Sequence, residues 1–186
     1  GQHQVLSSSS GFTGNVVVDS SELVVDGSLA GAAITIDSGS TLRGTGEVGT
    51  VAGAGTLSPG NSPGILTASS IDPSGAADFA FEMTSVGSPD YSQATSSLND
   101  VLRLRDTSEP FAAPLGAGND VDVYLNVADL SVGDSFRGGF YTDLGDNFLA
   151  TIEDATFSYY VALDGAGPRD FEGVGYYDLE AASVSN

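Results

Sequence analysis

Catalytic chemistry would have to come from a small set of side chains in this sequence. His3 is the only histidine, cysteine is absent, and 25 Asp and Glu residues supply most of the other groups that could exchange protons. A Ser-His-Asp triad needs its histidine held between a fixed serine and an orienting acid. Because His3 lies in a polar terminus, we interpret it as an exposed residue without a catalytic role.

Carboxylate pairs are a second source of chemistry, since glycosidases place two of them around the bond that they cleave. Glu22 with Asp26, and Asp143 with Asp146, are pairs of this kind. In a chain with 25 acids, however, close pairs arise from composition alone. We therefore predict that the chain is not an enzyme and has no catalytic residues.

The segment GTGEVG at residues 44–49 fits the dinucleotide-binding pattern in form. That pattern works only between a buried strand and a helix whose N-terminus holds the pyrophosphate. No helical pattern follows here, and Glu47 inside the loop would repel phosphate. The sequence therefore predicts tight turns at these glycines and no cofactor.

Calcium is the metal ion that this sequence could bind, because calcium takes six to eight carboxylate and carbonyl oxygens as ligands. Asp143, Asp146, Asn147 and Asp154 form one acidic region, and residues 119–122 form another. Neither spacing is that of an EF-hand. We interpret both as solvated turns and leave metal ligation open.

The charge balance excludes one class of partner. The formal net charge is -20, with five arginines, no lysine and a pI near 4.1. Nucleic-acid binding depends on Lys and Arg displacing counterions from phosphate, so no nucleic-acid partner is expected. No apolar stretch reaches the roughly 18 residues of a membrane helix, so we predict no membrane insertion. The start at Gly1 and Gln2 is interpreted as that of a mature or excised piece.

The elements that must position these residues are predicted to be strands. Short β-branched runs dominate, and Gly, Pro or Asp-Gly breaks separate them. Such runs are typical of strands, whereas the three-to-four spacing of amphipathic helices is rare and is best matched at residues 92–98. The fold class is therefore all-β. The clearest runs are residues 16–18, 23–25, 33–36, 121–125 and 157–163.

Two kinds of strand pattern divide the chain. Up to residue 65 the runs are short, the side chains are small and tight Gly turns recur, which favours a short β-solenoid resembling a parallel β-helix. The two prolines of residues 57–64 would interrupt a ladder and mark its exit. From residue 66 onward the runs lengthen and carry aromatics, which favours an antiparallel β-sandwich.

The first third also resembles a known repeat. The phrase GTLSPGNSPGILT at residues 55–67 is typical of the autotransporter-associated β-strand repeat and of exported bacterial surface proteins of the PEP-CTERM type. Earlier runs match the order of that repeat. A weaker match, at residues 130–136 and 140–143, is to the domain that often follows the repeat. The matching runs are residues 15–18, 23–29, 33–36 and 38–46.

This resemblance implies a β-solenoid passenger on a bacterial cell surface, with no catalytic residues to carry over. The chain lacks the C-terminal membrane barrel and the sorting tail found in such proteins, so the resemblance leaves the export route open. Secreted or cell-surface localisation is therefore expected.

These observations give a domain division and a leading functional hypothesis. Residues 1–14 are an N-terminal segment whose residues 2–6 could add as a strand to another chain, residues 15–65 are solenoid coils, and residues 66–186 are a sandwich domain. Exposed strand edges pair readily with other strands. We therefore predict an extracellular structural protein that self-assembles with copies of itself, through strand edges, into filaments or stalks.

The alternative is an adhesive or carbohydrate-binding module that holds surface glycans or other surface proteins. Its candidate contact residues are Tyr159, Tyr160, Tyr176 and Tyr177. Exposed tyrosines in a planar row would favour this reading, whereas an uncapped solenoid end would favour assembly. A passive spacer is the third hypothesis.

Overall fold

The computed structural model describes residues 1–9, 11–61, 63–72, 75, 77–84, 99–105, 120–126, 139–142, 156–162, 169–171 and 174–178. Side chains are described up to residue 105, from 121 to 126 and at Ala162, and elsewhere the backbone alone is described. These residues form strands and contain no α-helix, so the all-β prediction is confirmed for them. No helix in this part of the chain could cross a membrane.

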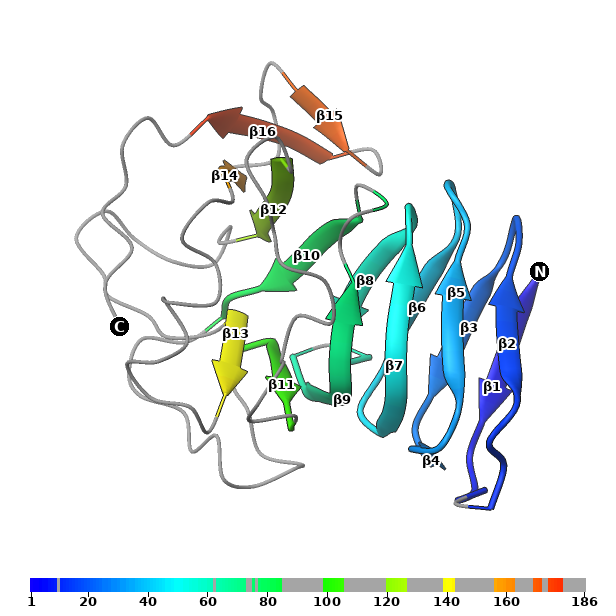
Figure 1. The fold of residues 1–186 in the computed structure, drawn as a ribbon. Coiled ribbons are helices and arrows are strands. Elements are labelled where there is room, and N and C mark those ends of the chain that lie inside the picture. Colours follow the sequence, from blue (N-terminus) through cyan, green and yellow to red (C-terminus); the bar gives the residue numbers. More distant parts are fainter. Residues whose placement is uncertain are drawn as a thin grey trace.

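The strands lie in two sheets, and the chain alternates between them from one strand to the next along most of its length (Figure 1). The nine-stranded sheet contains, in spatial order, β1 (Gln2–Val5), β3 (Glu22–Val25), β6 (Thr41–Gly44), β8 (Thr56–Pro59), β10 (Asp78–Glu82), β12 (Asp120–Asn126), β14 (Thr156–Ala162), β16 (Val174–Asp178) and β15 (Arg169–Phe171). The seven-stranded sheet contains β13 (Gly139–Thr142), β11 (Val101–Leu104), β9 (Ile65–Asp72), β7 (Glu47–Gly53), β5 (Ala33–Ile36) and β2 (Asn15–Val18), with β4 (Ser28–Leu29) also paired to β7.

Strand pairing is parallel in both sheets except where β16 joins β14 and β15, and the antiparallel sandwich predicted from residue 66 onward is wrong. β9 pairs in parallel with β7 before it and with β11 after it, and β10, β12 and β14 continue the parallel ladder of β8. Antiparallel pairs among the described strands are limited to β14 with β16 and β15 with β16. Pairing therefore continues across residue 66.

The aromatic residues that favour a sandwich in the sequence lie in the same core as the earlier strands, as Phe79 and Phe81 show. Phe79 is in register with Leu57 of the preceding layer and with Val123 of the next, and all three side chains are buried. A bulky residue at an inward position therefore fits the same two-sheet core without reversing a strand. Strand direction is set by the connection between strands, which aromatic content does not encode.

The segment at residues 55–67 also lies within the stack. The prediction that residues 57–64 mark its exit is therefore wrong. Thr56 to Pro59 form β8, and Gly60 exchanges backbone hydrogen bonds of 2.8 and 3.1 Å with Gly44. Pro59 is the last residue of β8, in register with Gly44, and Pro63 lies between β8 and β9, so neither proline is in the middle of a strand.

Alternating side chains from both sheets fill one apolar core. In β5, Ile34 and Ile36 are buried, whereas Ala33 and Thr35 point to solvent, as the period of two in a strand requires. Leu42 and Leu57 are neighbours in register and are fully buried. Each layer of the stack therefore covers the apolar side chains of the layer beside it.

Glycines at the corners allow the layers to approach closely. Gly53 has a φ of 119°, and a Cβ added to it would lie 2.1 Å from the carbonyl oxygen of Ile36. Gly44 has the same φ, and its Cβ would lie 2.2 Å from the carbonyl oxygen of Val25. The small corner residues expected from the sequence are thus required by backbone contact between adjacent layers.

Candidate functional site

The N-terminal end of the stack is formed by β1 in one sheet and β2 in the other. Among the described strands, β1 pairs only with β3 and β2 pairs only with β5. Figure 1 shows these two strands at the same end of the molecule, running in opposite directions. Among the described strands, β1 and β2 are therefore each paired on one side only.

The hydrogen bonds on the inner side of each edge strand identify the backbone groups on the open side. The carbonyls of Gly1 and Val5 accept hydrogen bonds of 2.9 Å from the N–H groups of Glu22 and Asp26. Because backbone direction alternates along a strand, the N–H and C=O groups of Gln2 and Gln4 face outward from the sheet edge.

The same reasoning applies to β2. The carbonyls of Gly14 and Val18 accept hydrogen bonds of 3.2 and 2.9 Å from the N–H groups of Ala33 and Asp37. The backbone groups of Asn15 and Val17 consequently face the open edge, where no described residue pairs with them. Together the two edges present donors and acceptors that another strand could use.

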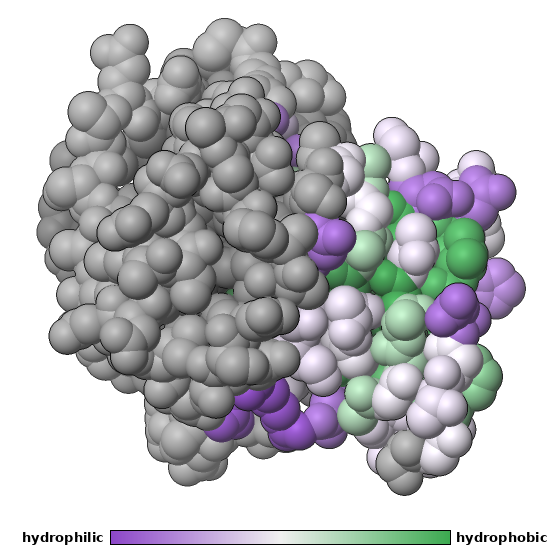
Figure 2. Space-filling view, in the orientation of Figure 1, coloured by the Kyte–Doolittle hydropathy of each residue, from purple (hydrophilic) through white to green (hydrophobic). Residues whose placement is uncertain are grey.

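Exposed apolar side chains lie on β2 and in the segment that joins β1 to β2. Leu6, Phe12 and Val17 are the exposed large hydrophobic residues of the described chain, and Val17 on β2 is 63% exposed. Figure 2 shows hydrophobic surface at this end, bordered by hydrophilic residues. A groove of about 390 Å³ opens between the first strands of the two sheets. Its lining consists of His3, Val16, Val17, Val18, Asp19, Ser21 and Leu23.

This end is also free of formal charge along its edge strands. Residues 1–18 contain no Asp, Glu or Arg, although the whole chain has a net charge of -20. Soluble proteins commonly protect edge strands with charges, prolines or bulges. β1 and β2 contain no Asp, Glu, Lys or Arg and no proline.

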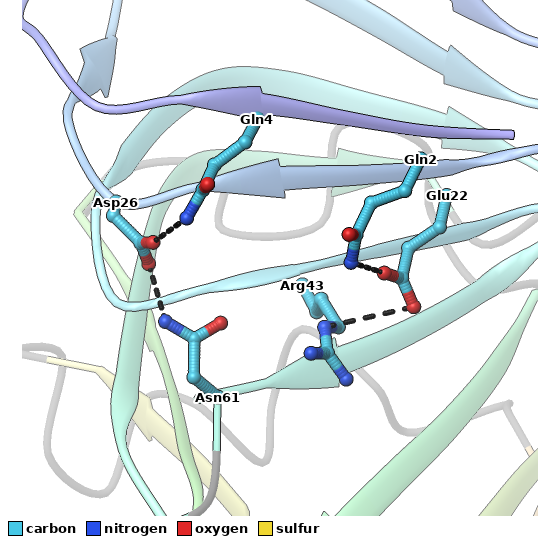
Figure 3. Close-up of polar contacts among 6 residues, drawn as sticks. All are labelled: Gln2, Gln4, Glu22, Asp26, Arg43 and Asn61. Atoms are coloured by element: carbon cyan, nitrogen blue, oxygen red, sulfur yellow. Dashed lines mark hydrogen bonds and ion pairs between the residues drawn. The ribbon is translucent and has the colours of Figure 1, made fainter.

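Polar contacts fasten β1 to the layers behind it (Figure 3). The amide of Gln4 donates to one oxygen of Asp26 at 3.0 Å, and the amide of Asn61 donates to the other at 2.7 Å. Thr45 donates to that second oxygen through its N–H at 3.2 Å and its hydroxyl at 3.3 Å. Partial burial acts to raise the pKa of Asp26, but these hydrogen bonds outweigh it and lower the pKa. Asp26 therefore links four successive layers at one corner.

Glu22 has a similar structural role at the other end of β3. It accepts a hydrogen bond from Gln2 and forms an ion pair with Arg43, whose Nε lies 3.6 Å from Oε2 (Figure 3). The carboxylates of Glu22 and Asp26, considered in the sequence as a catalytic pair, are each engaged by neighbouring strands. Their contacts link neighbouring layers of the stack.

The other candidates from the sequence fall into three groups. Residues 44–49 contain the end of β6 and the start of β7, so strand and turn occupy this pattern where a nucleotide site needs a helix. Asn119, Asp143, Asp146, Asn147 and Asp154 lie outside the described residues, as do residues 92–98. The four tyrosines belong to β14 and β16, where the backbone alone is described. In the described part of the chain, no three His, Asp or Glu side chains group as a metal site.

Sequence reasoning missed one polar site in the interior. Asp100 is 3% exposed and accepts hydrogen bonds from the N–H of Gly64 at 2.8 Å and the N–H of Glu82 at 2.7 Å. It thus joins the ends of strands from both sheets. Burial raises the pKa of Asp100 to about 7, against the effect of the two N–H donors, and the charge of Glu82 raises it further. The only signal in the sequence is an Asn-Asp pair directly before the run Val-Leu-Arg-Leu.

Comparison with protein-family models, curated proteins and solved structures gives no match.

Proposed function

We propose that this chain is an extracellular structural protein of a bacterial surface that associates with copies of itself through strand edges. On this proposal the two-sheet stack is a β-solenoid of the kind that the autotransporter-associated repeat implies, and association builds filaments or stalks. The observation that carries the proposal is that β1 and β2 are each paired on one side only among the described strands, in a segment, residues 1–18, that has no Asp, Glu or Arg.

Three features of that end support association rather than exposure to solvent. Its backbone groups at Gln2, Gln4, Asn15 and Val17 face away from the described sheets. Val17 is exposed on the outer face, and Val16 is only partly buried although its neighbour in register, Ile34, is fully covered. Addition of a strand would satisfy the backbone and cover apolar surface in one step.

The repeat-like features provide the second line of support, this time for location. Parallel strands that alternate between sheets, with glycine corners at Gly44 and Gly53, are consistent with the β-solenoid passenger implied by the resemblance. Such passengers are displayed outside the cell, so secretion or cell-surface display is part of the proposal.

The experiment is sedimentation and negative-stain electron microscopy of residues 1–186 over a wide range of protein concentration. Ordered chains or oligomers that grow with concentration are expected. The Val17→Pro variant removes an outward N–H without breaking a bond to β5, so it should block association while keeping the monomer folded. Val17→Thr, which keeps both the N–H and β-branching, is the matched control and should associate normally.

Monodisperse particles at every concentration would overturn the proposed assembly. They would shift the assignment to the adhesive or carbohydrate-binding module, which glycan-array binding would then test.

A further inference from the structure

We infer that Asn99 and Asp100 form a proton-operated clamp where the chain passes from β10 in one sheet to β11 in the other. The clamp is closed while the carboxyl group of Asp100 carries a proton, and it opens locally when the proton leaves. Opening separates Asp100 from the end of β10 and from the residue before β9, and it leaves the strand ladders of the stack intact. The clamp belongs to the single chain, so it operates whether or not copies associate.

Asn99 joins the two points at which the chain leaves and re-enters the described stack. Its Oδ1 accepts a hydrogen bond of 2.8 Å from the N–H of Thr84, and Asn99 forms an antiparallel bridge with Met83. Both Met83 and Asn99 are buried. The N–H of Met83 donates in turn to the carbonyl of Asn126 in β12 at 2.8 Å. The connection from β10 to β11 is therefore closed at its base, inside the protein.

Asp100 ties the two sheets to each other. One carboxyl oxygen accepts from the N–H of Gly64, directly before β9, at 2.8 Å, and the other accepts from the N–H of Glu82, at the end of β10, at 2.7 Å. The backbone returns both contacts. The N–H of Asp100 donates to the carbonyl of Glu82 at 2.8 Å, and the N–H of Val101 donates to that of Gly64 at 2.9 Å. Four hydrogen bonds thus depend on the position of one buried residue and its neighbour.

The protonation state of Asp100 decides how well it fits this place. An ionised carboxylate accepts hydrogen bonds at both oxygens, whereas the neutral acid keeps one full acceptor and gains an O–H donor. Burial disfavours the charged form, the two N–H donors favour it, and the charge of Glu82 opposes it further. The net result is a pKa of about 7, so Asp100 changes charge near neutral pH rather than near its ordinary value of 3.8.

The strands around Asp100 give a negative charge little compensation. Glu82 is the described group whose charge acts on Asp100, and it disfavours ionisation. Four of the five other charged residues of β9 to β12 are also acidic. These five are Asp72 at the end of β9, Asp78 at the start of β10, Arg103 in β11, and Asp120 and Asp122 in β12.

The direction of the switch follows from proton linkage. In the open form Asp100 is in water and titrates near 3.8, whereas in the closed form its pKa is about 7. The closed form therefore binds the proton more tightly and is favoured in acid. Between about pH 4 and about pH 7, the ratio of closed to open clamps falls about tenfold for each pH unit, and above about pH 7 it is constant.

Amide hydrogen exchange of the 186-residue chain, followed residue by residue by NMR from about pH 5 to about pH 8, tests the clamp. The probes are the N–H groups of Gly64 and Glu82, which donate to Asp100. The reference is the N–H of Thr56, which donates to the carbonyl of Ser40 at 2.9 Å in an inner layer. Urea below the unfolding transition separates local opening from unfolding, because it accelerates only openings that expose much surface.

Protection of Gly64 and Glu82, corrected for intrinsic exchange, should fall about 100-fold between pH 5 and pH 7 and then level off. It should not depend on urea, because the opening is local. The N–H of Thr56 should be more strongly protected and should respond to urea. Protection of Gly64 and Glu82 that is unchanged between pH 5 and pH 7 would overturn the clamp. So would a urea dependence equal to that of Thr56, since exchange would then require unfolding.

Two variants assign the titration to Asp100. Asp100→Asn has no proton to lose, so Gly64 and Glu82 should show the same protection at every pH. Glu82→Gln keeps the backbone N–H but removes the opposing charge, so the pKa of Asp100 should fall and protection should level off at a lower pH. Asp37→Asn removes an exposed carboxylate and should keep the wild-type profile.

A pH dependence that persists in Asp100→Asn would refute the assignment to this residue. If that variant fails to fold, Glu82→Gln decides the question, because an unshifted profile would assign the titration to another acid.

Discussion

His3 stands in register with Leu23 at the head of an inward-facing column of the nine-stranded sheet. The column continues through Leu42, Leu57 and Phe79, which are fully buried, so His3 occupies a position that every later layer fills with an apolar side chain. Its neighbours Gln2 and Gln4 bond to carboxylates on the outer face, and His3 itself lines the groove between the sheets. A polar ring at this point limits how favourably the end can be covered.

Replacing this ring should strengthen self-association. We expect His3→Val to strengthen self-association by about tenfold or more, because each copy gains an apolar side chain in the groove where it had a polar one. Sedimentation equilibrium gives the dissociation constant. Thr35→Val, which adds a similar side chain on the outer face of β5, is the control and should leave it unchanged. An unaltered constant in His3→Val would show that the groove is not covered on association.

Salt should promote association between chains of such high charge. Raising NaCl from about 0.01 M to about 0.1 M shortens the Debye length from about 30 Å to about 10 Å and screens the repulsion between copies. The dissociation constant should therefore fall as salt rises. Calcium chloride at equal ionic strength separates screening from ligation, since a larger effect of calcium would reveal a bound ion. Weaker association at higher salt would contradict the charge argument.

Asp100 should make stability depend on pH. Its pKa of about 7 in the folded chain is above the value of 3.8 in the unfolded chain, so the folded state binds this proton more tightly. The resulting stability is full below about pH 4, declines as the pH rises and is lost above about pH 7, a change of about 3 kcal/mol between pH 5 and pH 8.

The measurement for Asp100 is the free energy of unfolding by urea at each pH. Asp100→Asn should remove most of this slope, whatever its stability at any single pH. Asp37→Asn removes one exposed carboxylate with the same change in net charge and should keep the slope of the wild type. A slope that persists in Asp100→Asn would assign the pH dependence to other acids.

The glycine corners should tolerate substitution unequally. Gly53→Ala forces a Cβ to within 2.1 Å of the Ile36 carbonyl oxygen at a φ of 119°, so we expect a loss of about 3 kcal/mol or more. Gly39→Ala meets no atom within 4 Å and has a φ of 77°, so it should lose only about 1 to 2 kcal/mol. Urea unfolding of both variants measures the difference. Equal losses would show that close contact between layers does not constrain Gly53.

The sequence alone determined the features that depend on near neighbours. Short β-branched runs with a period of two, as at Ala33–Ile36, predicted strands and their inward faces correctly because side-chain alternation is a local property. Recurrent glycines predicted tight corners because few other residues accept a positive φ. The lack of acidic residues in the first 18 positions could also be read directly from the sequence.

Only the tertiary structure decided the properties that depend on distant segments. Phe79 and Phe81 pack in a parallel layer rather than in an antiparallel sandwich, because strand direction follows from how connections return to the sheet. The burial of Asp100 depends on Gly64 and Glu82, which are 36 and 18 residues away. Whether the edges of β1 and β2 have a neighbour is likewise a property of the assembled sheets. A local pattern fixes which residues can pair, but the long-range packing of the chain fixes which of them do.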